Sequence, residues 1–251
     1  MYVDVARRAG VALLTLDAPD RLNAFGVEDI RALDEAVHDA LRDADVGAIV
    51  LTGRGRAFCA GADVRAMARS ADRPQLFRDL TKHHHEVVRE LRTSPKPIVT
   101  AVNGVAAGGG FGLALAGDLR VGCPDARFRP GYLALGVPPD GGLTHLLPRA
   151  VGPAAAQRIV LEDALVGAEE ALRLGILHRV VEAERVVDEA AALAERLAAW
   201  PREPFAQTKA LLNGTYDNPL TVQLAEERMG IVRAAAAEPL ARGVERFLKK
   251  G

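Results

Sequence analysis

The chain has 251 residues, of which 49% are hydrophobic and 26% are charged, and its formal net charge is −1. This length suits one large domain, or a domain with an appendage, and is enough to bury a substantial core. The near-neutral charge argues against bulk attraction to nucleic acid or to acidic membranes, so neither is predicted as a partner.

The cysteine content and the N-terminal segment indicate the compartment. The two cysteines, Cys59 and Cys123, are too few for a disulfide framework. The opening run MYVDVARRAGVALLTL lacks the charged region, apolar core and cleavage site of a signal peptide. No apolar stretch is long and uninterrupted enough to cross a bilayer. These features predict a cytoplasmic protein.

The first half of the chain alternates β-branched runs with helical patterns. Apolar residues recur at helical spacing between Val27 and Ala44, with Gly26 before this segment and Gly47 beyond it, and Ser70–Leu91 is also predicted to be mostly helical. Three runs are predicted to be buried strands: Val11–Leu16, Ala48–Thr52 and Pro97–Val102.

Helical periodicity dominates the last third of the chain. The clearest predicted helices are Val187–Trp200, Pro204–Leu212 and Leu220–Ala237. Proline interrupts the chain between the first two of these helices. The whole pattern predicts an α/β fold with a core in residues 1–195, followed by a helical region in residues 196–251.

A first glycine-rich turn follows the predicted strand Ala48–Thr52. It runs from Gly53 to Asp63, and its small residues at positions 59–62 allow a ligand to approach the backbone closely. The same composition also fits a tight surface turn. This segment alone does not decide between the two interpretations.

A second glycine-rich turn lies between the strand Pro97–Val102 and a predicted helix from Gly109 to Ala116. The first turn of that helix offers unpaired N–H groups and the positive end of a dipole, which suit an oxyanion or a phosphate. The segment is not a Walker loop, because no Gly-Lys-Ser/Thr follows, and its spacing does not fit the Rossmann fingerprint.

Together these motifs resemble the crotonase superfamily, also called the enoyl-CoA hydratase/isomerase family. The resemblance is carried by Arg21–Ala24, Arg56–Asp63 and Lys96–Asp118, and continues through Phe128, Leu135–Gly136 and Leu147–Arg149. It implies a spiral of ββα units with a helical C-terminal trimerisation region, in a homotrimer or a dimer of trimers. It also implies acyl-CoA substrates, with coenzyme A as part of the substrate and no other cofactor or metal.

The resemblance places an oxyanion hole at the backbone N–H groups of Ala62 and Gly109. Two preorganised donors stabilise the negative charge that develops on a thioester oxygen when a neighbouring proton is removed. The resemblance further assigns substrate contacts to Arg21, Ala24, Ala60, Asp63, Val64, Tyr132, Lys249 and Lys250. For the three basic residues, near the CoA phosphates, plain solvated side chains are an equally good interpretation.

Hydratases of the family hold water between two glutamates, and the matching positions here are Gly112 and Tyr132. Neither is a carboxylate, and a tyrosine, whose reference pKa is about 10, is a poor base near neutral pH. Efficient hydration is therefore not expected. The sequence favours the isomerase-like branch, which needs no added water.

Asp140, in the segment Leu135–Gly142, matches the carboxylate that moves a proton in the isomerase-like branches. In this interpretation it takes a proton from C2 of a 3-enoyl-CoA and returns it at C4, while Phe111, Leu133 and Leu135 exclude water. Asp140 also precedes a helical pattern, so a helix cap is an alternative role. In related dehalogenases an aspartate of this segment is the nucleophile.

Other side chains and functions stay open at this stage. His83-His84-His85 invites a metal site, but consecutive helical histidines point in different directions, so a partly exposed helix near the acyl-tail entrance is favoured. His145 fits a helix surface, Asp118 a structural role and Cys59 packing. The alternative functions are a hydratase, a hydrolase or dehalogenase with Asp140 as nucleophile, and a CoA-binding or RNA-binding scaffold.

Overall fold

The computed structural model describes residues 2–249 and has the predicted α/β architecture. Its larger sheet has the strand order β1-β2-β3-β5-β7-β10, in which β1 is antiparallel and every other pair is parallel. The strands are β1 (Val3–Arg8), β2 (Val11–Leu16), β3 (Ala48–Gly53), β5 (Ile98–Val102), β7 (Leu119–Gly122) and β10 (Arg179–Val180). The three predicted strands are confirmed, whereas β1 was not predicted.

A smaller sheet has the order β4-β6-β8-β9. Its strands are β4 (Ala57–Cys59), β6 (Val105–Ala107), β8 (Arg127–Arg129) and β9 (Val166–Gly167). The pairs β3/β4, β5/β6 and β7/β8 each place one strand in the large sheet and the next in the small sheet. Helical segments follow each pair, so the core has the repeated ββα units that the resemblance implied.

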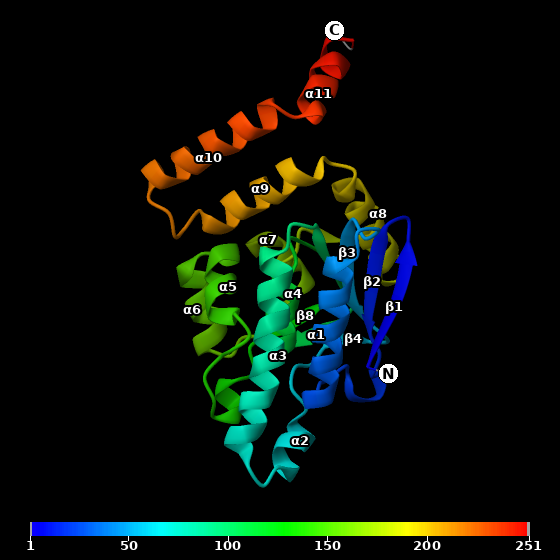
Figure 1. Ribbon diagram of the computed structural model, residues 1–251. Helices are drawn as coiled ribbons and strands as arrows, with labels where there is room; N and C mark the ends of the chain where they lie inside the picture. Colours follow the sequence, from blue (N-terminus) through cyan, green and yellow to red (C-terminus); the bar gives the residue numbers. More distant parts are fainter. Residues whose placement is uncertain (1, 250–251) are drawn as a thin grey trace.

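Helices cover both faces of the large sheet (Figure 1). On one face α8 (Val186–Ala198) packs against β3, β5 and β7; on the other, α1 (Val27–Arg42) contacts β1 and β2, and α4 (Gly109–Ala116) contacts β5. Every residue of β3 and β5 is buried, which explains why both are continuous apolar runs. The remaining core helices are α5 (Leu143–Val151), α6 (Pro153–Leu161) and α7 (Ala168–Leu174).

The predicted helix over Ser70–Leu91 is confirmed as α3 (Arg73–Thr93). A short helix α2 (Val64–Arg69) precedes it and was not predicted. The Asp72 carboxylate accepts a hydrogen bond from the Gln75 N–H, and Pro74 occupies the first turn of α3. This is an ordinary helix-start signal, so the start of α3 was available to sequence reasoning.

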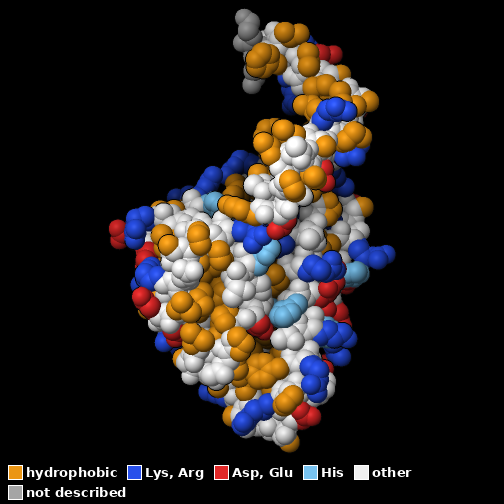
Figure 2. Space-filling view, turned by 90° about the vertical axis from the view of Figure 1, so that its left-hand side faces the viewer, with side chains coloured by type: hydrophobic (Ala, Val, Ile, Leu, Met, Phe, Trp, Pro, Cys, Tyr) orange, Lys and Arg blue, Asp and Glu red, His pale blue; other side chains and the backbone are white. Residues whose placement is uncertain are grey.

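Three helices follow α8: α9 (Arg202–Gly214), α10 (Leu220–Ala235) and α11 (Glu238–Leu248). The first lies against the core, and the other two form an arm on which hydrophobic side chains are exposed (Figure 2). Residues 199–201 connect α8 to α9, and the predicted division of the chain into a core and a helical region at 195/196 stays a prediction. Among the described residues, no helix has the length and apolarity that crossing a bilayer requires.

Candidate active site

The two glycine-rich turns lie side by side because the strands before them are parallel neighbours. β4 pairs with β6, so both strands lead into their turns at the same edge of the small sheet. Gly61 is where the turns approach most closely. It has φ +86°, and a Cβ there would lie 2.7 Å from the Ala107 carbonyl oxygen and 3.0 Å from the Gly109 nitrogen. Only glycine allows both the backbone angle and the contact.

The N–H of Ala62 points away from the bridge that holds its turn. The Phe25 N–H donates to the Gly61 carbonyl and the Asp63 N–H donates to the Phe25 carbonyl, both at 2.9 Å. These bonds fix the backbone on either side of Ala62. Within residues 2–249 the Ala62 N–H itself has no acceptor.

The N–H of Gly109 is the first of helix α4, whose eight residues are all buried. Gly108, with φ 53° and ψ −126°, makes the sharp turn into this helix. The first N–H groups of a helix have no intrahelical acceptor, and the Gly109 N–H finds none elsewhere in the described chain. It therefore stands at the positive end of a helix enclosed by protein.

His84 of α3 contacts the first residue of this helix. Its Nε2 lies 3.1 Å from the Gly109 carbonyl oxygen, and only 2% of the residue is exposed. Because a carbonyl only accepts, this contact assigns the proton to Nε2. Burial lowers the pKa of His84 against an opposing contribution from Asp140, so the ring is a neutral donor.

A cavity of about 390 Å³ lies in front of the two free N–H groups. This volume is within the usual range of small-molecule sites. Its walls come from the two turns, from α2 and α3, and from the loop 131–140. Apolar side chains predominate, among them Phe25, Val64, Met67, Phe77, Leu80, Leu135 and Val137. Figure 2 shows hydrophobic side chains gathered in the lower part of the face that it presents.

Asp140 is the carboxylate that lines this cavity. The hydroxyl of Tyr132, a residue that is only 8% exposed, donates to Asp140 Oδ1 at 2.6 Å. His85 Nε2 lies 3.6 Å from Asp140 Oδ2 and accepts the Gly141 N–H at 3.3 Å. Burial, followed by the charge of Asp140, raises the pKa of Tyr132, so its hydroxyl stays protonated as a donor.

Asp140 does not cap the following helix. The N-cap of α5 is Gly142, and no side chain caps it. The Asp140 carbonyl oxygen accepts the Leu143 N–H, while its carboxylate turns toward Tyr132. The cap interpretation is therefore wrong, and the side chain is available to a ligand.

Comparisons with known proteins match this geometry. The family model described as enoyl-CoA hydratase/isomerase matches residues 6–251. The chain belongs to the enoyl-CoA hydratase/isomerase family. It is 38% identical over 243 residues to a 1,2-epoxyphenylacetyl-CoA isomerase of Escherichia coli, covering 96% of this chain and 93% of that protein. A probable enoyl-CoA hydratase of Rhodobacter capsulatus is 36% identical over 241 residues, 96% of this chain and 92% of that one.

Solved structures show the same relationship. A putative enoyl-CoA hydratase from Streptomyces coelicolor superposes with a TM-score of 0.92 at 37% identity, covering 100% of this chain and 92% of that one. An enoyl-CoA hydratase subunit from Geobacillus kaustophilus gives 0.91 at 35% identity, covering 100% and 96%. This enoyl-CoA hydratase/isomerase family member therefore has the crotonase fold, as predicted, with two mixed sheets and C-terminal helices.

Some predicted substrate contacts of this family member line the cavity and others do not. Ala60, Val64 and Tyr132 line it together with Ala62, Gly109 and Asp140. Ala24 is buried outside the lining, and the Asp63 carboxylate instead caps α2 by accepting the Arg65 N–H at 2.8 Å. Arg21 holds Asp29 through two hydrogen bonds of 2.8 and 2.9 Å.

The predicted C-terminal contacts lie elsewhere. The side chain of Lys249, which follows α11, is 79% exposed. In Figure 1, α11 lies at the opposite end of the molecule from α2, which lines the cavity. Lys250 lies outside the described residues. Of the predicted apolar wall, only Leu135 lines the cavity. Phe111 packs instead against Phe128, with ring centroids 5.1 Å apart, and Leu133 is 46% exposed outside the lining.

Gly112 shows why one hydratase position carries no carboxylate. A Cβ at Gly112 would lie 2.3 Å from the Gly141 carbonyl oxygen. No side chain fits there unless the loop carrying Asp140 moves. The loop that carries Asp140 therefore occupies the space that a hydratase glutamate at position 112 would need.

The sequence interpretation missed the role of the histidines. His84 falls in the apolar stripe of α3 with Leu80, Val87, Val88 and Leu91, a spacing that could have placed it inside. His83 diverges as expected, with its Nδ1 2.7 Å from Asp34 Oδ2 of α1. The other two histidines do not diverge, because ligand atoms of His84, His85 and Asp140 lie within 4.8 Å of one another.

Proposed function

We propose that this chain is an enoyl-CoA isomerase that moves a proton from C2 to C4 of an acyl-CoA thioester, in Δ3,Δ2-enoyl or phenylacetate-type ring isomerisation. The observation that carries the proposal is the placement of Asp140. It is the carboxylate in the lining of a cavity that also holds the free N–H groups of Ala62 and Gly109. One base and an enolate holder are sufficient for this reaction.

In the proposed reaction, the thioester oxygen accepts hydrogen bonds from the Ala62 and Gly109 N–H groups. The Asp140 carboxylate removes a proton from C2, and the electron pair delocalises into a dienolate whose oxygen the two donors stabilise. The same carboxyl group then returns the proton at C4, and the double bond moves to C2–C3. No atom is gained or lost, and Asp140 ends in its starting state.

The test is turnover of 3-hexenoyl-CoA, followed by the absorbance of the conjugated product, with Asp140→Asn. We expect kcat to fall by about 10²–10⁴-fold, the usual contribution of a positioned acid–base group. Asp188→Asn is the matched control, because Asp188 is 77% exposed and pairs only with Arg8 on the surface. Unchanged turnover in Asp140→Asn contradicts the proposal.

Two further assays separate the alternatives. Conversion of crotonyl-CoA to a 3-hydroxyacyl-CoA at a rate above isomerisation would favour a hydratase. A covalent acyl or aryl adduct on Asp140, detected by mass spectrometry, would favour a hydrolase or dehalogenase. Tight CoA binding with no turnover of any of these substrates would favour a scaffold.

We also propose that the chain assembles as a homotrimer or a dimer of trimers. Nine large apolar side chains of α10 and α11 are between 49% and 82% exposed, an extent that favours an interface. They are Leu220, Leu224, Met229, Ile231, Val232, Leu240, Val244, Phe247 and Leu248. In such an assembly Lys249 would reach the CoA phosphates of another copy. Light scattering after size-exclusion chromatography tests the assembly, and a monomer at micromolar concentration contradicts it.

A further inference from the structure

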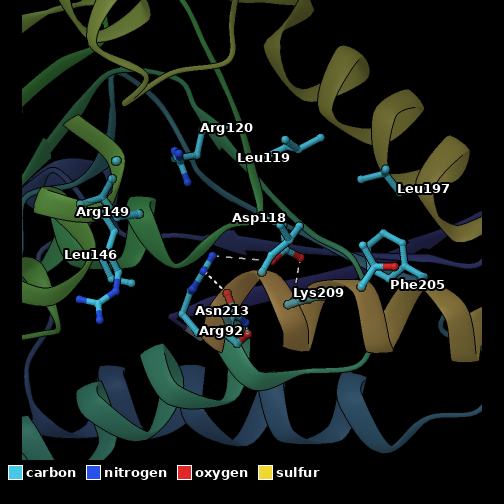
Figure 3. A pocket seen from close by; sticks show the side chains of 14 residues that line it. Arg92, Asp118, Leu119, Arg120, Leu146, Arg149, Leu197, Phe205, Lys209 and Asn213 are labelled. Carbon is cyan, nitrogen blue, oxygen red and sulfur yellow. Dashed lines mark hydrogen bonds and ion pairs between the residues drawn. The ribbon is translucent and has the colours of Figure 1, made fainter. Parts of the chain in front are cut away.

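A second cavity of about 390 Å³ lies between the core and α9 (Figure 3). Residues from α3, α4, β7, α5, α8 and α9 form its walls, and none of these residues lines the cavity of Asp140. The reaction proposed above uses no residue of this second cavity.

Positive charge dominates the walls of this cavity. Arg92, Arg120, Arg149 and Lys209 line it together with one carboxylate, Asp118. Lys209 Nζ lies 2.8 Å from Asp118 Oδ2 and an Arg92 terminal nitrogen lies 3.7 Å from Asp118 Oδ1, so the one carboxylate is shared by two of the four cations. Figure 3 shows the three arginines along one side of the space, with Asp118 and Lys209 meeting beside α9.

Arg120 is a buried cation without an ionic partner. It is only 7% exposed and donates to the carbonyl oxygens of Gly117, Gly175 and Ile176 at 2.6–3.2 Å. These bonds use three of its five N–H donors, and no carboxylate of residues 2–249 lies within 4.0 Å. Burial, followed by the charge of Arg92, lowers the pKa of Arg120 to about 10, so it remains charged at neutral pH. An unpaired buried charge is costly.

Arg149 adds an unused donor in the same place. Its two terminal nitrogens bond the His145 carbonyl and, at 3.0 Å, the Asp217 carboxylate on the exposed rim. Its Nε is buried and has no hydrogen-bond partner within the part of the chain that the structure describes. Buried donors normally have a partner, so Arg149 keeps an unsatisfied donor beside the cavity.

The other wall of the cavity is apolar. Leu115, Leu146, Phe205 and Leu212 contribute to it, two from the core and two from α9. A ligand that satisfies both walls carries one negative group and a compact hydrocarbon body. Inorganic phosphate would satisfy only the cationic wall.

We propose that this cavity binds a small organic carboxylate, with its carboxylate against Arg120 and Arg149 and its apolar part against α9. The bound anion would neutralise the excess charge of the walls and connect the core to α9. The site is distinct from the acyl-CoA cavity, so the two ligands would bind together.

The experiment is a calorimetric titration of the full-length protein with benzoate, in saturating butyryl-CoA so that the first cavity is occupied. We expect about one benzoate per chain, and no measurable binding of benzamide, which has the same shape without the charge. Arg149→Gln should weaken benzoate binding at least about tenfold, since hydrogen bonds between charged groups are the strong ones. Arg173→Gln, at a 71% exposed surface arginine, should change nothing.

A second measurement does not depend on the folding of any variant. In crystals grown with 4-bromobenzoate, the anomalous signal of bromine should lie between Arg120 and Phe205. The proposal is overturned if butyryl-CoA abolishes benzoate binding, if benzamide binds equally well, or if inorganic phosphate binds more tightly than benzoate. A carboxylate side chain of another copy in this cavity would also overturn it.

Discussion

The two cavities have the same volume, about 390 Å³, but they attract negative charge in different ways. The first presents backbone N–H groups at Ala62 and Gly109, positioned by two glycine-rich turns. The second presents side-chain cations from separate elements, concentrated around Arg120. The first type of site is suited to a charge that develops on one atom during a reaction, because its donors are rigid.

The two sites should therefore lose their affinity for negative charge through different substitutions. Backbone donors persist when side chains change and are lost only when the chain itself is displaced. A side-chain cation such as Arg149 is removed by a single substitution. The predictions below use this difference, from the largest expected effect to the smallest.

Gly61→Ala should have the largest effect. Its Cβ would overlap the Ala107 carbonyl oxygen at 2.7 Å, in a backbone conformation that alanine rarely adopts, and would push the two turns apart. Because losing one oxyanion donor costs on the order of 10²–10³ in kcat, we expect at least that loss in isomerisation. Gly10→Ala is the matched control, since Gly10 also has a positive φ but its Cβ would make only an ordinary 3.6 Å contact. Equal activity of the two variants would contradict the role of the turns.

Gly112→Glu should lower isomerisation by about a hundredfold without creating a hydratase. The new Cβ would overlap the Gly141 carbonyl oxygen at 2.3 Å and displace Asp140, and a shift of about 1 Å is enough for such a loss. Gly167→Glu, where nothing lies within 4 Å, is the control. Both variants would be assayed with 3-hexenoyl-CoA and crotonyl-CoA. Efficient hydration by Gly112→Glu would show that the missing glutamate alone separates the two reactions.

The first cavity was predictable from sequence because its chemistry lies in contiguous motifs. Residues 60–62, 108–110 and 112 are small, as the close approach of neighbouring backbone requires at Gly61, Gly110 and Gly112, and the resemblance to a known family implies their roles. The second cavity was not predictable, because Arg92, Arg120, Arg149 and Lys209 lie on four different elements. Tertiary packing brings them together, and no local pattern records it. Asp118 was predicted to be structural, and its bonds to Ile98 and Lys209 fit that role.

Residues with several possible partners were also beyond the sequence. The sequence left Arg21 available for a phosphate, but in the structure its guanidinium makes two hydrogen bonds to the Asp29 carboxylate. Phe111 follows the glycines directly, yet the helix turns its ring toward Phe128 and away from the cavity. In both cases the direction of the side chain decides, and direction depends on the neighbouring elements.

Tyr132→Phe should slow isomerisation by about tenfold. The substitution removes the 2.6 Å hydrogen bond to Asp140 Oδ1, and hydrogen bonds to charged groups contribute about 1.5–3 kcal/mol. The ring and its packing remain, so KM should change less than kcat. Tyr216→Phe is the control, because Tyr216 is 69% exposed and lies outside the cavity. A Tyr132→Phe enzyme with full activity would show that Asp140 needs no support from this hydroxyl.

His178→Gln should have the smallest effect, which is a change in how stability depends on pH below neutrality. His178 Nδ1 accepts a hydrogen bond from the backbone N–H of Arg120 at 3.0 Å. Burial, followed by the charge of the Arg120 side chain, lowers the pKa of His178 to about 4. The unfolded chain takes up this proton below its ordinary pKa of about 6.5, whereas the folded chain does not until about pH 4. Folded-state stability should therefore fall as the pH decreases through this window.

A glutamine at position 178 can accept the same N–H without titrating. Urea midpoints of the parent and His178→Gln proteins should differ by a constant amount above about pH 7, and the parent should lose more stability between about pH 6.5 and pH 4. Because His178 is partly exposed to solvent, this extra loss of stability in the parent protein should be modest. Added benzoate should reduce it, since an anion beside Arg120 reduces the positive field at His178. Parallel curves with and without benzoate would place the bound carboxylate away from Arg120.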